Sequence, residues 1–400
     1  MIPLAEARAV VLAGCPVGDA VLMALTDALG CVLATPVVSS EAVPPFANTA
    51  MDGYAVQAAD TASTPAVLRV VGTLAAGAAP TTPVGPGEAV RIMTGAPVPP
   101  GADAIVPVEV TAGTDDEVQI LEPAGVGDHV RPAGEDIQAG QQVFAAGTVL
   151  RPGHLGVLAS IGVEKIAVVP RPRVGVLSTG DELVDGGGPL GPGQIRDSNR
   201  STLLALCREA GFEAVDLGLA RDDESVIEAA VAGGLETCDA LVTSGGVSVG
   251  DFDYVKVVLD RLSGGGMRWM QISIRPAKPL AFGTVAGKPV FGLPGNPVSS
   301  MVSFELFALP GLRQMMGHTV LDRTRALGVA DEPLRRRPDG KIHFVRVVAG
   351  IEADGRFHVR SSGGQASNLL RSMALANALA VLPDGDGVEQ GGSVEVMLLG

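Results

Sequence analysis

The segment from Asp239 to Asp253 joins a short apolar run to a glycine-rich turn and two acidic residues. The apolar run ends in Thr-Ser-Gly-Gly at residues 243–246, and Asp251 and Asp253 follow a second turn of small residues. In an open parallel sheet, ligands bind beyond the carboxyl ends of the strands. A glycine-rich turn there exposes backbone N–H groups that can hold an anion. Aspartates beside the turn can hold a metal ion against that anion. The segment therefore predicts phosphate chemistry.

Two more acidic segments are expected at the same sheet edge. Residues 179–182, Thr-Gly-Asp-Glu, directly follow an expected strand, and residues 197–199, Asp-Ser-Asn, precede an expected helix. Helix capping explains Ser198 or Asn199 equally well. It does not explain Glu182, which proline and glycine rather than a helix follow. Several carboxylates converging on one edge predict a Mg²⁺ site that neutralises phosphate charge.

Cationic groups stand in a stiff turn farther along the chain. Residues 275–279, Arg-Pro-Ala-Lys-Pro, end an expected strand. Anion binding and ordinary surface charge explain these two cations about equally well. Residues 293–297, Leu-Pro-Gly-Asn-Pro, close another strand and open a helix whose N-terminus is a second potential anion seat.

Two familiar patterns are discounted by their context. Residues 186–191 fit GxGxxG, but no helix follows and a proline stands where it would begin. Residues 246–250 fit the GxSxG pattern of a hydrolase nucleophile. There, Gly250 and Asp251 delay the helix, and the later histidines lie outside the expected α/β region.

Composition bounds the class of protein. The 400 residues suffice for two to four domains, and 46% of them are apolar although only 10 Phe, 2 Tyr and 1 Trp occur. The cores must therefore be built from Ala, Val and Leu. A net charge of −15 repels nucleic acid and anionic membranes, so neither is an expected partner.

The cysteines and the apolar runs indicate the compartment. The four cysteines are scattered, which argues against disulfides and structural zinc. Glu6 and Arg8 interrupt the N-terminal apolar stretch, so no signal peptide is expected, and no apolar run reaches the length of a membrane span. We expect a soluble cytoplasmic protein.

Apolar spacing predicts four domains. Residues 1–46 and 141–171 are expected to form one discontinuous, elongated N-terminal domain, with helices at residues 17–29 and 150–162. Residues 47–140 read as a β-rich insert of short strands. Residues 172–320 alternate strands with helices and predict a doubly wound parallel α/β module. Residues 321–400 predict a small C-terminal β-barrel-like domain, with a hairpin turn at Asp354-Gly355.

Six motifs in order resemble those of the MoeA and gephyrin E-domain family of molybdopterin molybdenumtransferases. They are residues 48–56, NTAMDGYAV; 91–99, RIMTGAPVP; 134–137, GEDI; 178–183, STGDEL; 244–250, SGGVSVG; and 292–297, GLPGNP. The resemblance covers essentially the whole chain. It implies a four-domain elongated homodimer whose third domain binds molybdopterin and whose active site lies between subunits.

In the implied reaction, adenylylated molybdopterin and molybdate react in the presence of Mg²⁺ to give molybdenum cofactor and AMP. A molybdopterin adenylyltransferase is an expected partner. The expected catalytic residues are Asp52, Thr94, Glu182 and Asp253. The expected substrate-binding residues are Arg131, Asp136, Asp197, Asn199, Ser244, Gly245, Gly246, Ser248, Arg275, Lys278, Pro294, Pro297, Arg346 and Ser367. The expected metal-holding residues are Asp52, Glu182, Asp222, Asp223 and Asp253.

One turn departs from the family pattern. The family often has Lys-Pro-Gly-Lys-Pro where this chain has Arg-Pro-Ala-Lys-Pro at 275–279. Arg275 keeps the charge but offers a planar fork, and Ala277 restricts the turn. Three alternatives to the transferase are a clustering scaffold, a pterin-nucleotide binder without turnover, and a serine hydrolase with Ser248 as nucleophile.

Overall fold

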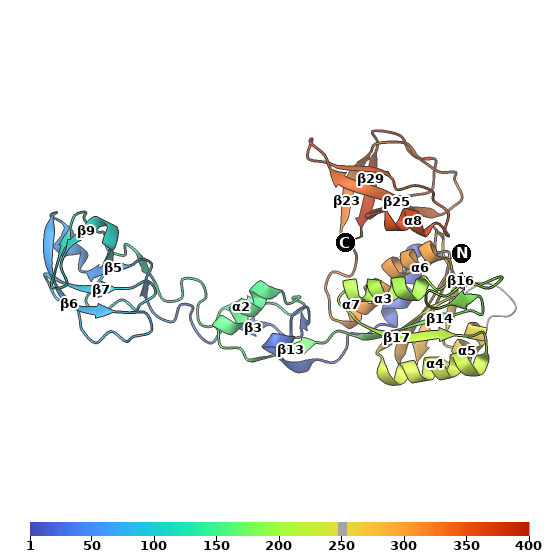
Figure 1. The fold of residues 1–400 in the computed structure, drawn as a ribbon, viewed down its shortest axis with the longest axis horizontal. Helices are drawn as coiled ribbons and strands as arrows, with labels where there is room; N and C mark the ends of the chain where they lie inside the picture. The colour runs from blue at the N-terminus through green and yellow to red at the C-terminus, as the bar shows by residue number, and fades with distance from the viewer. Residues whose placement is uncertain (247–253, 400) are drawn as a thin grey trace.

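The computed structural model describes residues 1–246 and 254–399. The molecule is elongated, with a β-rich insert at one end, a small domain in the middle and an α/β module at the other end (Figure 1). The C-terminal domain packs above the α/β module in the same view. The predicted multidomain mixed architecture is therefore confirmed.

The insert is built on one six-stranded sheet of order β8-β5-β7-β6-β10-β9. Successive residues of β5 serve two cores, because Tyr54 and Val56 pack into one apolar cluster and Ala55 into the other. The elements here are β4 (Asn48–Thr49), β5 (Gly53–Val56), η2 (Ala58–Thr61), β6 (Ala66–Leu74), β7 (Glu88–Ile92), β8 (Ala104–Pro107), η3 (Val108–Val110), β9 (Thr111–Gly113), β10 (Glu117–Ile120) and β11 (Val130–Arg131).

The middle domain is β-rich, and the prediction of a helical N-terminal domain is wrong. Instead of a helix over 17–29, the chain forms a short strand and a 3₁₀ turn, and the strand pairs antiparallel with β13. The helical spacing of apolar residues was accidental, since Leu22 is 69% exposed. The elements are β1 (Val21–Ala24), η1 (Leu25–Asp27), β2 (Val32–Leu33), β3 (Val37–Val38), β12 (Gln142–Phe144), α2 (Pro152–Ser160) and β13 (Lys165–Val169).

The α/β module is a six-stranded sheet of order β17-β14-β18-β22-β21-β19. Five of the six strands run in the same direction. Strand β21 runs in the opposite direction, because it pairs antiparallel with both β22 and β19. Helices α1, α3, α6 and α7 contribute to the apolar cluster on one face, and α4 and α5 to the cluster on the other. The doubly wound prediction is confirmed, with one reversed strand added.

The first helix, α1 (Leu4–Ala13), packs on this module against α7, η4 and β21. The other elements are β14 (Arg173–Thr179), β15 (Leu183–Val184), β16 (Ile195–Arg196), α3 (Asn199–Glu209), β17 (Glu213–Ala220), α4 (Glu224–Thr237), β18 (Ala240–Ser244), α5 (Tyr254–Leu262), β19 (Arg268–Gln271), β20 (Ile274–Arg275), β21 (Pro279–Val285), β22 (Lys288–Leu293), α6 (Pro297–Ser303), the π-helical turn η4 (Phe304–Ala308) and α7 (Leu309–Met315).

The C-terminal domain is a barrel of five strands in the order β25-β26-β23-β29-β27, closed by the pairing of β25 with β27. Strand β20 of the α/β module extends this sheet by pairing parallel with β25. The predicted hairpin is present, and Gly355 at its turn has φ 76°. The elements are β23 (Arg325–Ala330), β24 (Leu334–Arg335), β25 (Ile342–Ile351), β26 (Phe357–Ser361), α8 (Leu370–Ala374), β27 (Ala378–Leu382), β28 (Gly387–Val388) and β29 (Ser393–Leu398).

All four cysteines are buried as free thiols. Burial raises the pKa of both Cys15 and Cys207 to about 12, so these side chains serve as small apolar residues of the core.

Candidate functional site

Three parallel strands, β14, β18 and β22, end side by side and present their turns at one edge of the α/β sheet. Gly245 has φ 99°, and a Cβ there would lie 2.9 Å from the carbonyl oxygen of Thr179. Only glycine fits this close approach. The glycine-rich turn that the sequence predicts therefore begins where expected, while Ser248 and Asp253 lie outside the described residues.

Asn199 connects two of these turns. Its Nδ2 donates to Ser244 Oγ at 2.8 Å and to the carbonyl oxygen of Gly295 at 2.7 Å. Capping does not explain this side chain, because the N-cap of α3 is Ser198 and no side-chain bond caps the helix. Pro294 is buried in the adjoining turn, and Pro297 begins α6. Asn199 is therefore a clamp between the glycine-rich turn and the proline-rich turn.

Asp197 belongs to a buried ionic network around Arg200. The carboxylate of Asp197 is 1% exposed and accepts from Arg200 Nε at 3.1 Å and from Ser178 Oγ at 3.0 Å. Arg200 also pairs with Asp185 at 2.5 Å and with Asp216 at 2.9 Å. Hydrogen bonds to Arg200 lower the pKa of Asp216 against the opposing effect of burial. Sequence reasoning missed Arg200, which ties together three segments around the sheet edge.

The carboxylates predicted to hold metal divide into two groups. Asp181 and Asp222 lie together, because each backbone N–H donates to the other's carboxylate, at 3.4 Å and 3.2 Å. Glu182 is exposed on the same turn as Asp181. Asp223 instead caps α4: it accepts from the Ser225 hydroxyl and from two backbone N–H groups, and these bonds lower its pKa. Asp222 and Glu182 are therefore better placed to meet a ligand than Asp223.

A cavity of about 420 Å³ lies between the α/β module and the C-terminal domain. The exposed cations Arg275 and Lys278 line it, with Lys341, Ser367 and other polar residues. No Asp or Glu is among its lining residues, which are Ile274, Arg275, Pro276, Ala277, Lys278, Pro279, Asn296, Ser299, Lys341, Gln365, Ala366, Ser367 and Asn368. Its chemistry is that of a site for an anion.

The parallel pairing of Arg275 with His343 builds this cavity, since it joins the turn of one domain to the sheet of the other. Ala277 has φ 72°, the left-handed backbone for which the family's glycine is suited. Lys341, which directly precedes β25, was missed by sequence reasoning. A second cavity of about 510 Å³ shares Arg275 and Gln365 and continues along Arg335 and Arg337.

Arg346 holds the wall of the cavity and does not line it. The side chain is fully buried and donates to Ser372 Oγ at 3.1 Å and to the carbonyl oxygens of Gly364 and Ala366 at 2.7 Å and 3.2 Å. The Ser367 carbonyl accepts from the backbone of Val298 at 3.1 Å, at the start of α6. Arg346 is thus a positioning residue for the segment that carries Ser367.

Asp52 and Thr94 meet at the loop end of the insert. Asp52 Oδ1 accepts from the backbone N–H of Thr94 at 2.6 Å and from its hydroxyl at 2.7 Å. These two bonds favour the ionised carboxylate and lower the pKa of Asp52, whose side chain is exposed to solvent. Arg131 is exposed on β11, and that strand pairs with β4, the strand that precedes Asp52 in the sequence. Asp136 follows β11 in the sequence and is also exposed.

The structure brings the predicted residues together in two groups, not one. Asp52 and Thr94 lie in the insert, at the opposite end of the elongated chain from Glu182 and the glycine-rich turn (Figure 1). One chain therefore does not assemble the whole set. In the described part of the chain, no helix is both long and apolar enough to cross a membrane.

Three protein-family matches together include all four domains of the chain. Residues 2–162 match the MoeA N-terminal region (domains I and II), residues 175–314 a probable molybdopterin-binding domain, and residues 331–399 the MoeA C-terminal region (domain IV). A molybdopterin molybdenumtransferase 2 of Mycobacterium tuberculosis is 42% identical over 90% of each chain. The molybdopterin molybdenumtransferase of Haemophilus influenzae is 37% identical over 90% of this chain and 88% of its own.

The fold leads to the same group. The crystal structure of a molybdopterin biosynthesis MoeA protein from Pyrococcus horikosii has a TM-score of 0.82, with 31% identity over 100% of this chain and 99% of its own. The sheet-edge turns, the cation-lined cavity and the whole length of the chain thus agree in pointing to molybdenum cofactor biosynthesis. The chain belongs to the MoeA family of molybdopterin molybdenumtransferases.

Proposed function

We propose that the chain catalyses the final step of molybdenum cofactor biosynthesis, in which molybdate enters the dithiolene of adenylylated molybdopterin and AMP is released. The observation that carries this proposal is the cavity lined by Arg275, Lys278 and Lys341 and, among the described residues, by no carboxylate. In a chain of net charge −15, such a cavity concentrates an oxyanion against the overall field. Arg275 and Lys278 hold the molybdate, or a phosphate group, by charge-assisted hydrogen bonds.

The glycine-rich turn at Ser244 holds the phosphate end of the pterin substrate. Its backbone N–H groups lie at the carboxyl end of β18, where ligands of such sheets bind. Asn199 links Ser244 and Gly295 by hydrogen bonds, so that both turns face the same substrate. This support for the substrate pose ends at Gly246, because the described residues end there.

The carboxylates fit a Mg²⁺ ion in the mode in which substrate phosphates complete the coordination. In the described part of the chain, no three Asp, Glu, His or Cys side chains group as metal ligands. Mg²⁺ is usually bound by one or two carboxylates plus phosphate oxygens and waters, so Glu182 and Asp222 suffice on this side. When bound, the metal offsets charge on the pyrophosphate as the P–O bond breaks.

Asp52 completes the site from a second copy of the chain. Its separation from Glu182 within one chain supports a homodimer whose active site lies between subunits (Figure 1). Exposed apolar side chains of the middle domain, among them Leu22 and Val38, support an interface there. The hydrogen bonds from Thr94 orient the Asp52 carboxylate through Oδ1, and Oδ2 receives no hydrogen bond from any described residue.

The protein acts in the cytoplasm and receives its substrate from a molybdopterin adenylyltransferase. Its four domains follow the predicted division into residues 1–46 with 141–171, 47–140, 172–320 and 321–400. One change is favoured by the packing of α1 on the α/β module, which assigns residues 4–13 to that module.

The test is AMP release from adenylylated molybdopterin by the purified protein, with and without molybdate and Mg²⁺. Release that requires both, and that activates an apo-molybdoenzyme, supports the transferase and its metal. Tight binding of the substrate without release would instead indicate a carrier or a scaffold. Labelling by a fluorophosphonate at Ser248 would indicate a serine hydrolase, and we expect none.

A further inference from the structure

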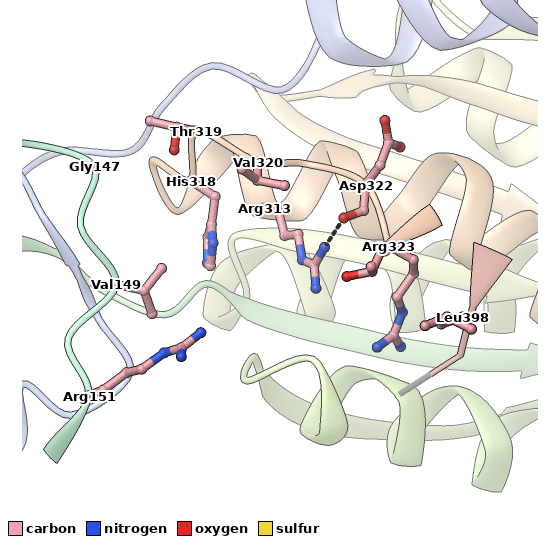
Figure 2. A pocket seen from close by; sticks show the side chains of 11 residues that line it. Gly147, Val149, Arg151, Arg313, His318, Thr319, Val320, Asp322, Arg323 and Leu398 are labelled. Carbon is pink, nitrogen blue, oxygen red and sulfur yellow. Dashed lines mark hydrogen bonds between the residues drawn. The ribbon is translucent and has the colours of Figure 1, made fainter. Parts of the chain in front are cut away.

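A third cavity, also lined by cations, lies on a different set of elements from the proposed active site. It has a volume of about 500 Å³ and is lined from the segment 147–151, the end of α7, the connection 318–324 and the end of β29 (Figure 2). It therefore touches the middle domain, the α/β module and the C-terminal domain together. It shares no lining residue with the cavity around Lys278.

The polar side chains of this cavity converge. Arg151 reaches in from the middle domain, and His318, Arg313 and Arg323 point toward the same space from the other wall (Figure 2). The Asp322 carboxylate points away from them in the same view, and its Oδ1 pairs with Arg8 at 2.7 Å.

The carboxylates nearby neutralise only part of this charge. Arg323 is held by both carboxylate oxygens of Glu305, at 2.8 Å and 3.0 Å. Arg313 donates to the carbonyl oxygens of Leu321 and Asp322, which carry no formal charge. Within the described residues, neither Arg313 nor Arg151 has a carboxylate within 4.0 Å. Two guanidinium groups thus face one cavity without a counter-ion from the chain.

Burial is the main influence on the titration of Arg313 and His318, and the neighbouring cations add to it. Burial and the neighbouring Arg323 lower the pKa of Arg313, and burial and Arg313 lower the pKa of His318. The buried Nε2 of His318 has no hydrogen-bond partner among the described residues. A bound anion would relieve the repulsion between the guanidinium groups.

The walls are close-packed around this space. Gly147 has φ 82°, and a Cβ there would lie 2.7 Å from Thr319 Cγ2, so the middle domain approaches the connection as closely as glycine permits. Val149, Val320 and Leu398 supply an apolar side to the cavity. The cavity thus carries cationic and apolar side chains on the same segments, which suits a phosphate group that carries an organic part.

We propose that this cavity is a binding site for a dianionic phosphoryl group, held by Arg151 and Arg313, at the junction of three domains. The ligand is either free phosphate or a phosphate monoester, and its binding fixes the three domains relative to one another. The site is separate from the chemistry proposed above and does not depend on it.

The test uses the full-length protein labelled with ¹³C at histidine, since the chain has only 5 histidines. The His318 resonance, assigned with His318→Gln, reports on this cavity, and His343 reports on the cavities around Arg275. Sodium phosphate and AMP are titrated separately. We expect saturable shifts of His318 with both probes. Tighter binding of AMP by about tenfold would identify a monoester as the ligand, and equal affinity would identify free phosphate.

The variants separate this cavity from the active site. Arg151→Gln is expected to weaken the response of His318 by about tenfold or more, while Lys278→Gln leaves it unchanged. Lys165→Gln, an exposed cation of the same middle domain, is the charge-matched control. Arg151 is exposed, so the variant is expected to fold, and its melting curve checks this. A His318 signal that does not move, or that moves equally in Arg151→Gln, overturns the proposal.

Discussion

At the insert, the Asp52 carboxylate is exposed and accepts hydrogen bonds from Thr94, whereas at the edge of the α/β sheet the Asp197 carboxylate is buried between Arg200 and Ser178. The first arrangement leaves an ionised oxygen available to a ligand. The second uses the whole carboxylate to hold the chain. Acidic residues in similar loop contexts thus divide into those available to a ligand and those that hold the structure, and burial and hydrogen-bond partners separate the two.

The largest effect on stability is expected when the cationic partner of the buried Asp197 carboxylate is removed. Arg200→Met is expected to lower the free energy of unfolding by about 3 kcal/mol, because Asp197 is left as a buried charge without its counter-ion. Urea denaturation measures the change. Arg173→Gln, which removes an exposed ion pair with Glu213, should cost about 0–1 kcal/mol. Equal effects of the two variants would contradict the structural role of Arg200.

The opposite outcome is expected for the exposed carboxylate. Asp52→Asn should reduce AMP release roughly a hundredfold, as for loss of a carboxylate that holds the metal, with little change in stability. Turnover and denaturation measured on one preparation make the split visible. An Asp52→Asn protein with unchanged turnover would withdraw Asp52 from the catalytic set.

A smaller effect tests how Thr94 tunes that carboxylate. Thr94→Val removes the hydroxyl bond to Asp52 but keeps the backbone bond, so the pKa of Asp52 should rise toward its ordinary value. Any contribution of Asp52 to stability is present above its unfolded pKa and is lost as the pH falls through its lower folded pKa. Because the pKa of Asp52 rises in the variant, the acid limb of its pH–rate profile should move to higher pH. Thr94→Ser restores the hydroxyl and should restore the profile.

The smallest expected effect concerns the turn that carries the two cations. Ala277→Gly relieves a left-handed backbone at φ 72°, worth about 1 kcal/mol, but loses a buried methyl group worth about 0.8 kcal/mol. The two terms nearly cancel, so the free energy of unfolding should change by less than about 1 kcal/mol. A loss above 2 kcal/mol would mean that the methyl group, and not the backbone, decides the fit of this turn.

Local patterns predicted much of the α/β module. The alternation of apolar strands with helices over residues 172–320 was enough to predict a doubly wound module, because the residues of these elements pack on neighbours set by the periodicity itself. The same reasoning failed for residues 17–29, where pairing with β13 overrode an accidental helical spacing. Local propensity is a weak guide wherever a distant strand supplies the hydrogen bonds.

The candidate site divides in the same way. The amino-acid sequence alone was enough to predict the glycine turn at Gly245 and the cations of the 275–279 turn, because each depends on the conformation or charge of a few adjacent residues. Asp52 was predicted only through the family motif around it. Only the tertiary structure decided that Arg346 is buried behind the cavity, that Lys341 lines it and that Asp223 caps a helix. These roles depend on burial and on partners brought from distant parts of the chain, which no short pattern of residues contains.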